Sequence, residues 1–206
     1  MYSSSFDEQD AVEEGKQVYI SYGDKSNDEL LQLFGFVEID NPHDAFMAIG
    51  LEASVLASAP FSPGEVERRY ALLGRLKLDG AIDDAELSAQ GAPADTWHAL
   101  RIMLGSAAEL EGDLSKLSRP ASLATEERVW AVMRGYCKEA RAFLSGGQSG
   151  SSLKEAKREK EPRKKLAILY KAAKKELLAD LDGRIATLAL RSKKSGRVVG
   201  QLVSGK

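Results

Sequence analysis

The residue types that most often carry catalysis or bind metals are few and scattered in this sequence. The 206 residues contain two histidines, His43 and His98, and a single cysteine, Cys137. Neither an HExxH motif nor a Cys/His cluster occurs, so we expect no metal site. A phosphate-binding glycine loop and a G-x-S-x-G nucleophile motif are also missing, which leaves nucleotide binding and serine hydrolysis without support.

The segment 15–44 reads GKQVYISYGDKSNDELLQLFGFVEIDNPHD and carries several strong local signals. Alternating residues at 16–21 predict a short strand. The S-x-x-E pattern of Ser26 and Glu29 predicts a capping box that opens a helix. Gly35 is placed to end that helix in the left-handed conformation. The segment therefore predicts a strand, a tight turn and one short helix.

This segment resembles the end of the SET domain in protein-lysine methyltransferases related to the Rubisco large-subunit enzyme. The residues that match that family's motif are Tyr22, Ser26, Asn27, Glu29, Leu30, Gly35 and Phe36. The local pattern by itself has simpler explanations, which stay open. Tyr22 can be a half-buried residue at a strand end, and Phe34 a core residue at a helix end. Ser26 can be explained as a helix cap and Asn27 as a residue of the first helical turn, and we assign Asn27 no catalytic role.

The resemblance implies roles for two aromatic residues. In the family, a tyrosine at the place of Tyr22 borders the channel where the substrate amine meets the methyl group of S-adenosylmethionine, so Tyr22 is the expected catalytic residue. An aromatic at the place of Phe34 lines the same channel and influences how many methyl groups are added. Methyl transfer is an in-line displacement, and a phenol hydroxyl can orient the neutral amine by hydrogen bonding.

The resemblance also says where the cofactor belongs. The family's glycine-containing loop and its asparagine-histidine segment, which supply most contacts to S-adenosylmethionine, have no match here. We expect them upstream of Met1, with Tyr22 near the cofactor, so that the chain is an N-terminally truncated family member that does not bind the cofactor alone. Whether Met1 is the true start stays open.

Helical patterns dominate after residue 43. The predicted elements are a strand at 45–51, a helix opened by Ser62, Pro63 and Glu65, a short helix from Asp83 to Leu87, a helix from Asp95 or Thr96 to Leu104 and a longer helix from Thr125. A last helix starts at Lys154 or Pro162 and ends at Leu190. Its apolar stripe comprises Leu166, Leu169, Tyr170, Ala173, Leu177, Leu181, Ile185 and Leu188. We expect the tail 191–206 to be frayed.

The basic stretch 163–178 resembles the long helix in the helical substrate-binding domain of the same methyltransferases. In that family the helical lobe helps to hold the protein substrate. Residues 151–206 carry a net charge of +10 against −12 for residues 1–150. This asymmetry is typical of a solvated basic helix face, and it also fits an acidic partner protein. Aromatic residues are scarce there, which leaves little for base stacking and disfavours a role in nucleic-acid binding.

These observations predict a mainly α protein: a small β-containing SET remnant at 1–43, then an all-helical bundle-like lobe at 44–206 with a flexible link at 145–152. The expected function is S-adenosylmethionine-dependent protein-lysine methylation, with a lysine-bearing protein as substrate. The alternative is a non-catalytic helical interaction module, so whether this chain is an enzyme stays open, as does a histidine target. No apolar run is long enough to span a membrane, and an intracellular location is expected.

Overall fold

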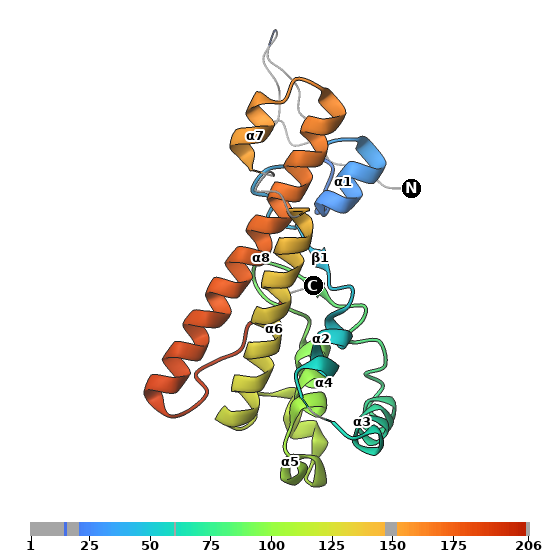
Figure 1. The fold of residues 1–206 in the computed structure, drawn as a ribbon, viewed down its shortest axis with the longest axis vertical. Coiled ribbons are helices and arrows are strands. Elements are labelled where there is room, and N and C mark those ends of the chain that lie inside the picture. Colours follow the sequence, from blue (N-terminus) through green and yellow to red (C-terminus); the bar gives the residue numbers. More distant parts are fainter. Residues whose placement is uncertain (1–14, 16–20, 60, 147–151, 205–206) are drawn as a thin grey trace, which may run out of the picture.

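The structure, a computed structural model, describes residues 15, 21–59, 61–146 and 152–204, and it is mostly helical, as predicted. The long helices α6 and α8 lie side by side (Figure 1). Helices α2 and α4 pack on α6, α3 packs on α4, and α7 packs on α8. The elements are α1 (Asn27–Phe34), β1 (Phe46–Met47), α2 (Leu51–Ala57), α3 (Pro63–Arg75), β2 (Glu86–Leu87), α4 (Ala94–Leu104), α5 (Ala107–Glu111), the 3-10 helix η2 (Leu114–Ser118), α6 (Leu123–Leu144), α7 (Leu153–Arg158) and α8 (Pro162–Ser195).

The main core lies between α6 and α8 and continues into α4. The buried apolar side chains of the two long helices are Val129, Trp130, Val132, Met133, Tyr136 and Cys137 on α6 and Ala172, Leu177, Leu178, Leu181 and Ile185 on α8. The predicted stripe on α8 is therefore confirmed as a core face in its second half. Its first half, with Leu166 and Leu169, is only partly buried, because this part of α8 extends beyond the end of α6 toward α1 and α7 (Figure 1).

Capping residues explain where the helices begin. The predicted capping boxes of Ser26 and Ser62 are both present, and Gly35 ends α1 with φ 75°, in the left-handed region. Helix α6 starts two residues earlier than predicted, at Leu123, because the Ser122 side chain accepts a hydrogen bond from the Thr125 amide.

The predicted helix from Asp83 to Leu87 is wrong. Residues 79–84 form a turn, in which the Asp84 amide donates to the Gly80 carbonyl at 2.8 Å. Strand β2 follows and pairs antiparallel with β1, so that Phe46 lies opposite Leu87. Pairing and the complete burial of Leu87 outweigh the local helix signal. The strand expected at 45–51 is confined to Phe46–Met47, because α2 begins at Leu51.

The described part of the tail, residues 191–204, is not frayed as expected, since α8 continues to Ser195 and the following residues return to α4. The Trp97 indole donates to the Leu202 carbonyl, and the Arg101 guanidinium donates to the Gln201 side chain at 2.8 Å. A bridge also joins Ala92 to Val203. Buried donors on α4 thus hold the tail in place.

The fold class is therefore mainly α, but the lobe 44–206 is not entirely helical, because it contains the β1–β2 sheet. In the described part of 1–43, α1 is present and Ser21 lies outside any strand, while the rest of the strand predicted at 16–21 falls outside the described residues. The same holds for most of the link 145–152. The division at residue 43 stays a prediction. Among the described residues, no helix has the length and apolarity that a membrane crossing requires.

Candidate functional site

The structure brings together three aromatic rings, one from the segment before α1, one from its last residue and one from just after it. The ring centroid of Tyr22 lies 4.5 Å from that of Phe34 and 5.2 Å from that of Phe36. Phe34 and Phe36 are 6.4 Å apart, and the left-handed turn at Gly35 lies between them. Tyr22 and Phe34 remain about half exposed, at 45% and 46%. We call Tyr22, Phe34 and Phe36 the aromatic patch.

A buried asparagine fixes the start of α1. Asn27 is fully buried, and its side chain exchanges two hydrogen bonds with the Glu38 backbone, at 3.0 and 2.9 Å. Its amide and its side-chain nitrogen donate to the two carboxylate oxygens of Asp44, at 2.9 and 3.0 Å. The Asn27 side chain thus has partners for both its oxygen and its nitrogen, as burial requires.

Lys174 on α8 connects this network to the helical lobe. Its side chain is 1% exposed, and its ammonium donates to Asp28, to Asp44 at 2.6 Å and to the Ala45 carbonyl. These bonds use all three ammonium donors. An isolated buried charge is very costly, so the two carboxylates account for a lysine inside the core. We call Lys174, Asp28 and Asp44 the lysine anchor.

Tyr170 completes the contact between α1 and α8. Its hydroxyl donates to Asp28 Oδ1 at 2.5 Å, and its ring lies 5.3 Å from Lys174 Nζ. Burial, and then the hydrogen bond to Asp28, raise the pKa of Tyr170 well above its ordinary value. The phenol therefore stays protonated at neutral pH and serves as a donor to Asp28.

The histidines and the cysteine lie in separate places. His43 pairs with Asp24 at 3.2 Å near the surface, and His98 on α4 contacts the Leu114 carbonyl at 3.0 Å. Cys137 is buried in the core, and burial raises its thiol pKa to about 12. Within the described ranges, no group of three acidic, histidine or cysteine side chains is arranged to hold a metal ion.

The aromatic patch does not by itself enclose S-adenosylmethionine. Its rings touch one another, and the Tyr22 hydroxyl has no hydrogen-bond partner in the part of the chain that the structure describes. The adjoining pocket of about 390 Å³ at Gly35 is lined by Arg163, Lys165, Leu166 and Leu169, with Pro162. It offers no carboxylate to the cofactor's ribose or ammonium group. The residues present form an apolar wall with one phenol, and such a wall does not make a complete binding site for the cofactor.

Of the residues singled out from the sequence, Tyr22 and Phe34 come together, and Phe36 joins them. The lysine anchor was missed, because Lys174 sits in an otherwise apolar stripe and its partners are more than 100 residues away. The presence of a lysine within such a stripe could have indicated the anchor, because a buried lysine requires a partner of opposite charge. Asn27 was interpreted as an ordinary first-turn residue, although it is the buried centre of the α1 connection.

A scan of the chain against models of protein families finds no match, and a search of curated proteins finds no similar sequence. The resemblance to SET methyltransferases therefore rests on the residues of segment 15–44 and on the basic helix.

Proposed function

We propose that this chain is the substrate-recognition part of an S-adenosylmethionine-dependent protein-lysine methyltransferase of the SET class. The observation that carries the proposal is the contact between Tyr22 and Phe34, the two residues that the resemblance assigns to the lysine channel. Tyr22 precedes α1 and Phe34 is its last residue, and both side chains remain about half exposed. An exposed aromatic wall with one hydroxyl suits a lysine side chain, which is a long apolar stem with a polar tip.

In this proposal, Tyr22 orients the target amine and Phe34 narrows the channel. The Tyr22 hydroxyl is free of partners in the described part of the chain, so it is available to an incoming amine. The lysine anchor holds α1 on α8, and the helical lobe contacts the surrounding substrate protein. S-adenosylmethionine would supply the methyl group, held by SET segments that have no match in these 206 residues.

The aromatic patch can be tested with a minimal ligand. N-acetyl-lysine amide and its norleucine analogue, which lacks the ammonium group, are titrated while the aromatic NMR resonances are followed. We expect lysine to shift the Tyr22 and Phe34 signals more than norleucine does, because a cation is attracted to a ring face. Phe143 on α6 is 86% exposed and serves as an internal control. Equal shifts at Phe143, or no shift at the patch, would refute the lysine-binding role.

The cofactor is tested separately by calorimetric titration of the 206-residue protein with S-adenosylmethionine and S-adenosylhomocysteine. We expect no binding to the folded protein, because the described residues around Tyr22 do not enclose a cofactor. Binding at micromolar strength would overturn this expectation and would make the chain a methyltransferase candidate by itself.

A second candidate is a protein-interaction module without chemistry. It is favoured by the basic side chains Arg163 and Lys165, both exposed, which line the pocket beside the aromatic patch. Such a pocket suits an acidic segment of a partner protein. The two candidates differ in the ligand titration, since an interaction module for acidic segments has no reason to prefer lysine over norleucine.

A further inference from the structure

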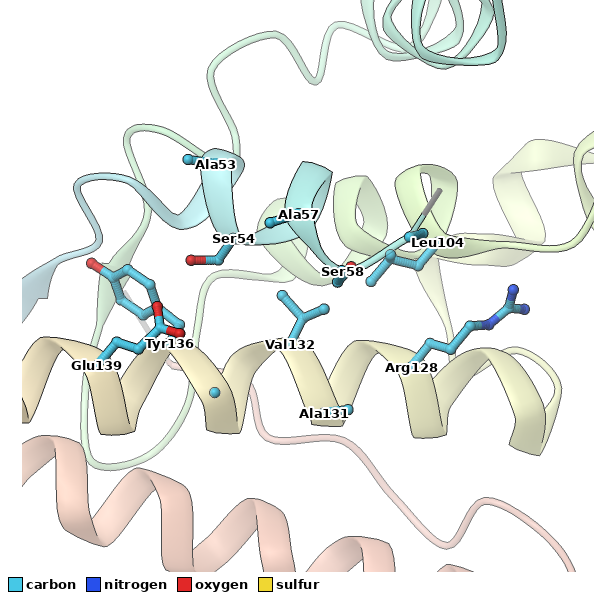
Figure 2. A pocket seen from close by; sticks show the side chains of 12 residues that line it. Ala53, Ser54, Ala57, Ser58, Leu104, Arg128, Ala131, Val132, Tyr136 and Glu139 are labelled. Atoms are coloured by element: carbon cyan, nitrogen blue, oxygen red, sulfur yellow. The ribbon is translucent and has the colours of Figure 1, made fainter. Parts of the chain in front are cut away.

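A groove between α2 and α6 is separate from the aromatic patch. It has a volume of about 540 Å³, and its apolar base comprises Leu104, Val132 and Tyr136, which are each at most 6% exposed (Figure 2). The Tyr136 hydroxyl donates to the Ile49 carbonyl at 3.0 Å, which fixes that ring at one end. The base is thus preformed and apolar, as is usual for a binding site.

The walls of the groove carry small side chains at helical spacing. Ala53 and Ala57 lie four residues apart on α2, and Ala131 and Gly135 lie four residues apart on α6, so each pair occupies one face of its helix. A Cβ placed on Gly135 would meet no atom within 4 Å, so the space above it is open. Small residues on two neighbouring helices leave room for a third helix to approach closely.

Opposite charges mark the two ends. Arg128 and Glu139 both lie on α6, both are exposed, and Figure 2 shows them at opposite ends of the groove. The Arg128 side chain donates to Ala124 and Thr125, both in its own helix. The Glu139 side chain forms no ion pair or hydrogen bond within the described ranges. Their separation of eleven residues corresponds to about 16 Å, or roughly three turns of helix.

We infer that this groove binds an amphipathic helix of about three turns from a partner protein. The helix dipole sets the orientation: the positive N-terminal end lies at Glu139 and the negative C-terminal end at Arg128, antiparallel to α6. Apolar side chains of the bound helix cover Leu104 and Val132, which is the helix-in-groove mode of recognition. The inference deepens the proposal that the helical lobe contacts a protein and rests on it.

The probe is a stapled 14-residue helical peptide with leucines on one face, a lysine in its first turn and a glutamate in its last. A second stapled peptide has the two charges exchanged. Fluorescence anisotropy should show that the protein prefers the first peptide by about tenfold, since two exposed ion pairs become two repulsions. The double variant R128E/E139R should prefer the exchanged peptide instead.

A groove-blocking variant has a matched control on the same helix. Ala131→Arg should abolish binding, whereas Ala124→Arg, also exposed on α6 but outside the groove, should leave it unchanged. Circular dichroism of both variants establishes that they are folded.

Three results would overturn the inference. They are failure of both peptides to bind, equal affinity for the two peptides in the original protein and in R128E/E139R, and an Ala131-dependent dimer in sedimentation, which would assign the groove to a second copy. The lysine titration reports on Tyr22 and Phe34 and not on α2 or α6, so failure of the groove is distinguishable from failure of the aromatic patch.

Discussion

Replacing Lys174 by methionine should destabilise the protein by about 3 kcal/mol, because it removes one partner of a buried ion pair. The Asp44 side chain is 6% exposed and loses the cation with which it pairs, so its charge remains in the core. The Asp44 carboxylate still accepts hydrogen bonds from three donors: the Asn27 amide, the Asn27 side chain and the Ala45 amide. The loss of stability therefore lies at the lower end of the range usual for a broken buried ion pair. Asp28 is 53% exposed and keeps its bond to Tyr170, so it adds little.

Urea denaturation followed by tryptophan fluorescence measures this loss, since Trp97 and Trp130 are both buried. With a slope of roughly 2.5 kcal/mol per molar urea, the midpoint should fall by about 1 M. The matched control is Lys171→Met on the same helix, where the side chain is exposed and the change should stay within about 0.5 kcal/mol. The double variant K174M/D44N should recover part of the loss. Equal losses for Lys174 and Lys171 would refute the anchor.

Two further predictions concern the tail and the buried thiol. Gly91→Ala should lower the free energy of unfolding by about 1–3 kcal/mol and make residues 197–204 accessible to a protease, because its Cβ would lie 2.2 Å from the Leu202 carbonyl oxygen. The control is Gly135→Ala, where a Cβ would meet no atom within 4 Å. Equal rates of proteolysis for the two variants would contradict the contact between Gly91 and the tail. Burial raises the pKa of Cys137 from 9 to about 12, so the unfolded chain loses its thiol proton first as pH rises. This group's contribution to stability is therefore complete below pH 9 and is lost as pH rises toward about 12, by about 1.4 kcal/mol per pH unit. Urea midpoints across that window should fall less steeply for Cys137→Ala, and equal slopes would count against the burial effect.

Local signals were the part of the fold that could be predicted from the sequence. The capping boxes at Ser26 and Ser62 and the glycine stop at Gly35 depend on residues within one turn, so the sequence determines them. A third box, Ser106 with Glu109, has the same S-x-x-E spacing and was overlooked. Its Glu109 is partly buried, which raises its pKa, but hydrogen bonds from Ser106, Thr125 and Ser122 outweigh this and lower the pKa to about 2.

Pairings between distant residues could not be predicted in the same way. The turn before β2 contains Asp83 and Asp84, which have good helix-capping chemistry, yet pairing with β1 decides the structure there. Arg101 looks like an ordinary helix residue, but it is fully buried against Glu126 at 2.5 Å and reaches Gln201. Arg69 similarly covers the end of α4 by donating to the carbonyls of Ile102, Met103 and Gly105. Single-sequence periodicity holds no information on such partners.

In the candidate sites too, contacts within one local segment could be predicted and contacts between distant segments could not. The sequence singled out Tyr22 and Phe34, which lie within one local segment on either side of a short capped helix, and their rings are in contact. The α2–α6 groove is formed by two helices about 80 residues apart in the chain, so no local sequence pattern predicts it.

The distance along the chain between Asp28 and Lys174 has a consequence for biosynthesis. They are 146 positions apart, so α1 leaves the ribosome long before Lys174 has been synthesised. At about 5–20 residues per second, that delay is roughly 7 to 30 seconds. During this time Asp28 and Asp44 have no Lys174 to pair with, so the contact between α1 and α8 cannot form. The lysine anchor can therefore form only after α8 has been made, so the docking of α1 on α8 is a late step of folding during synthesis.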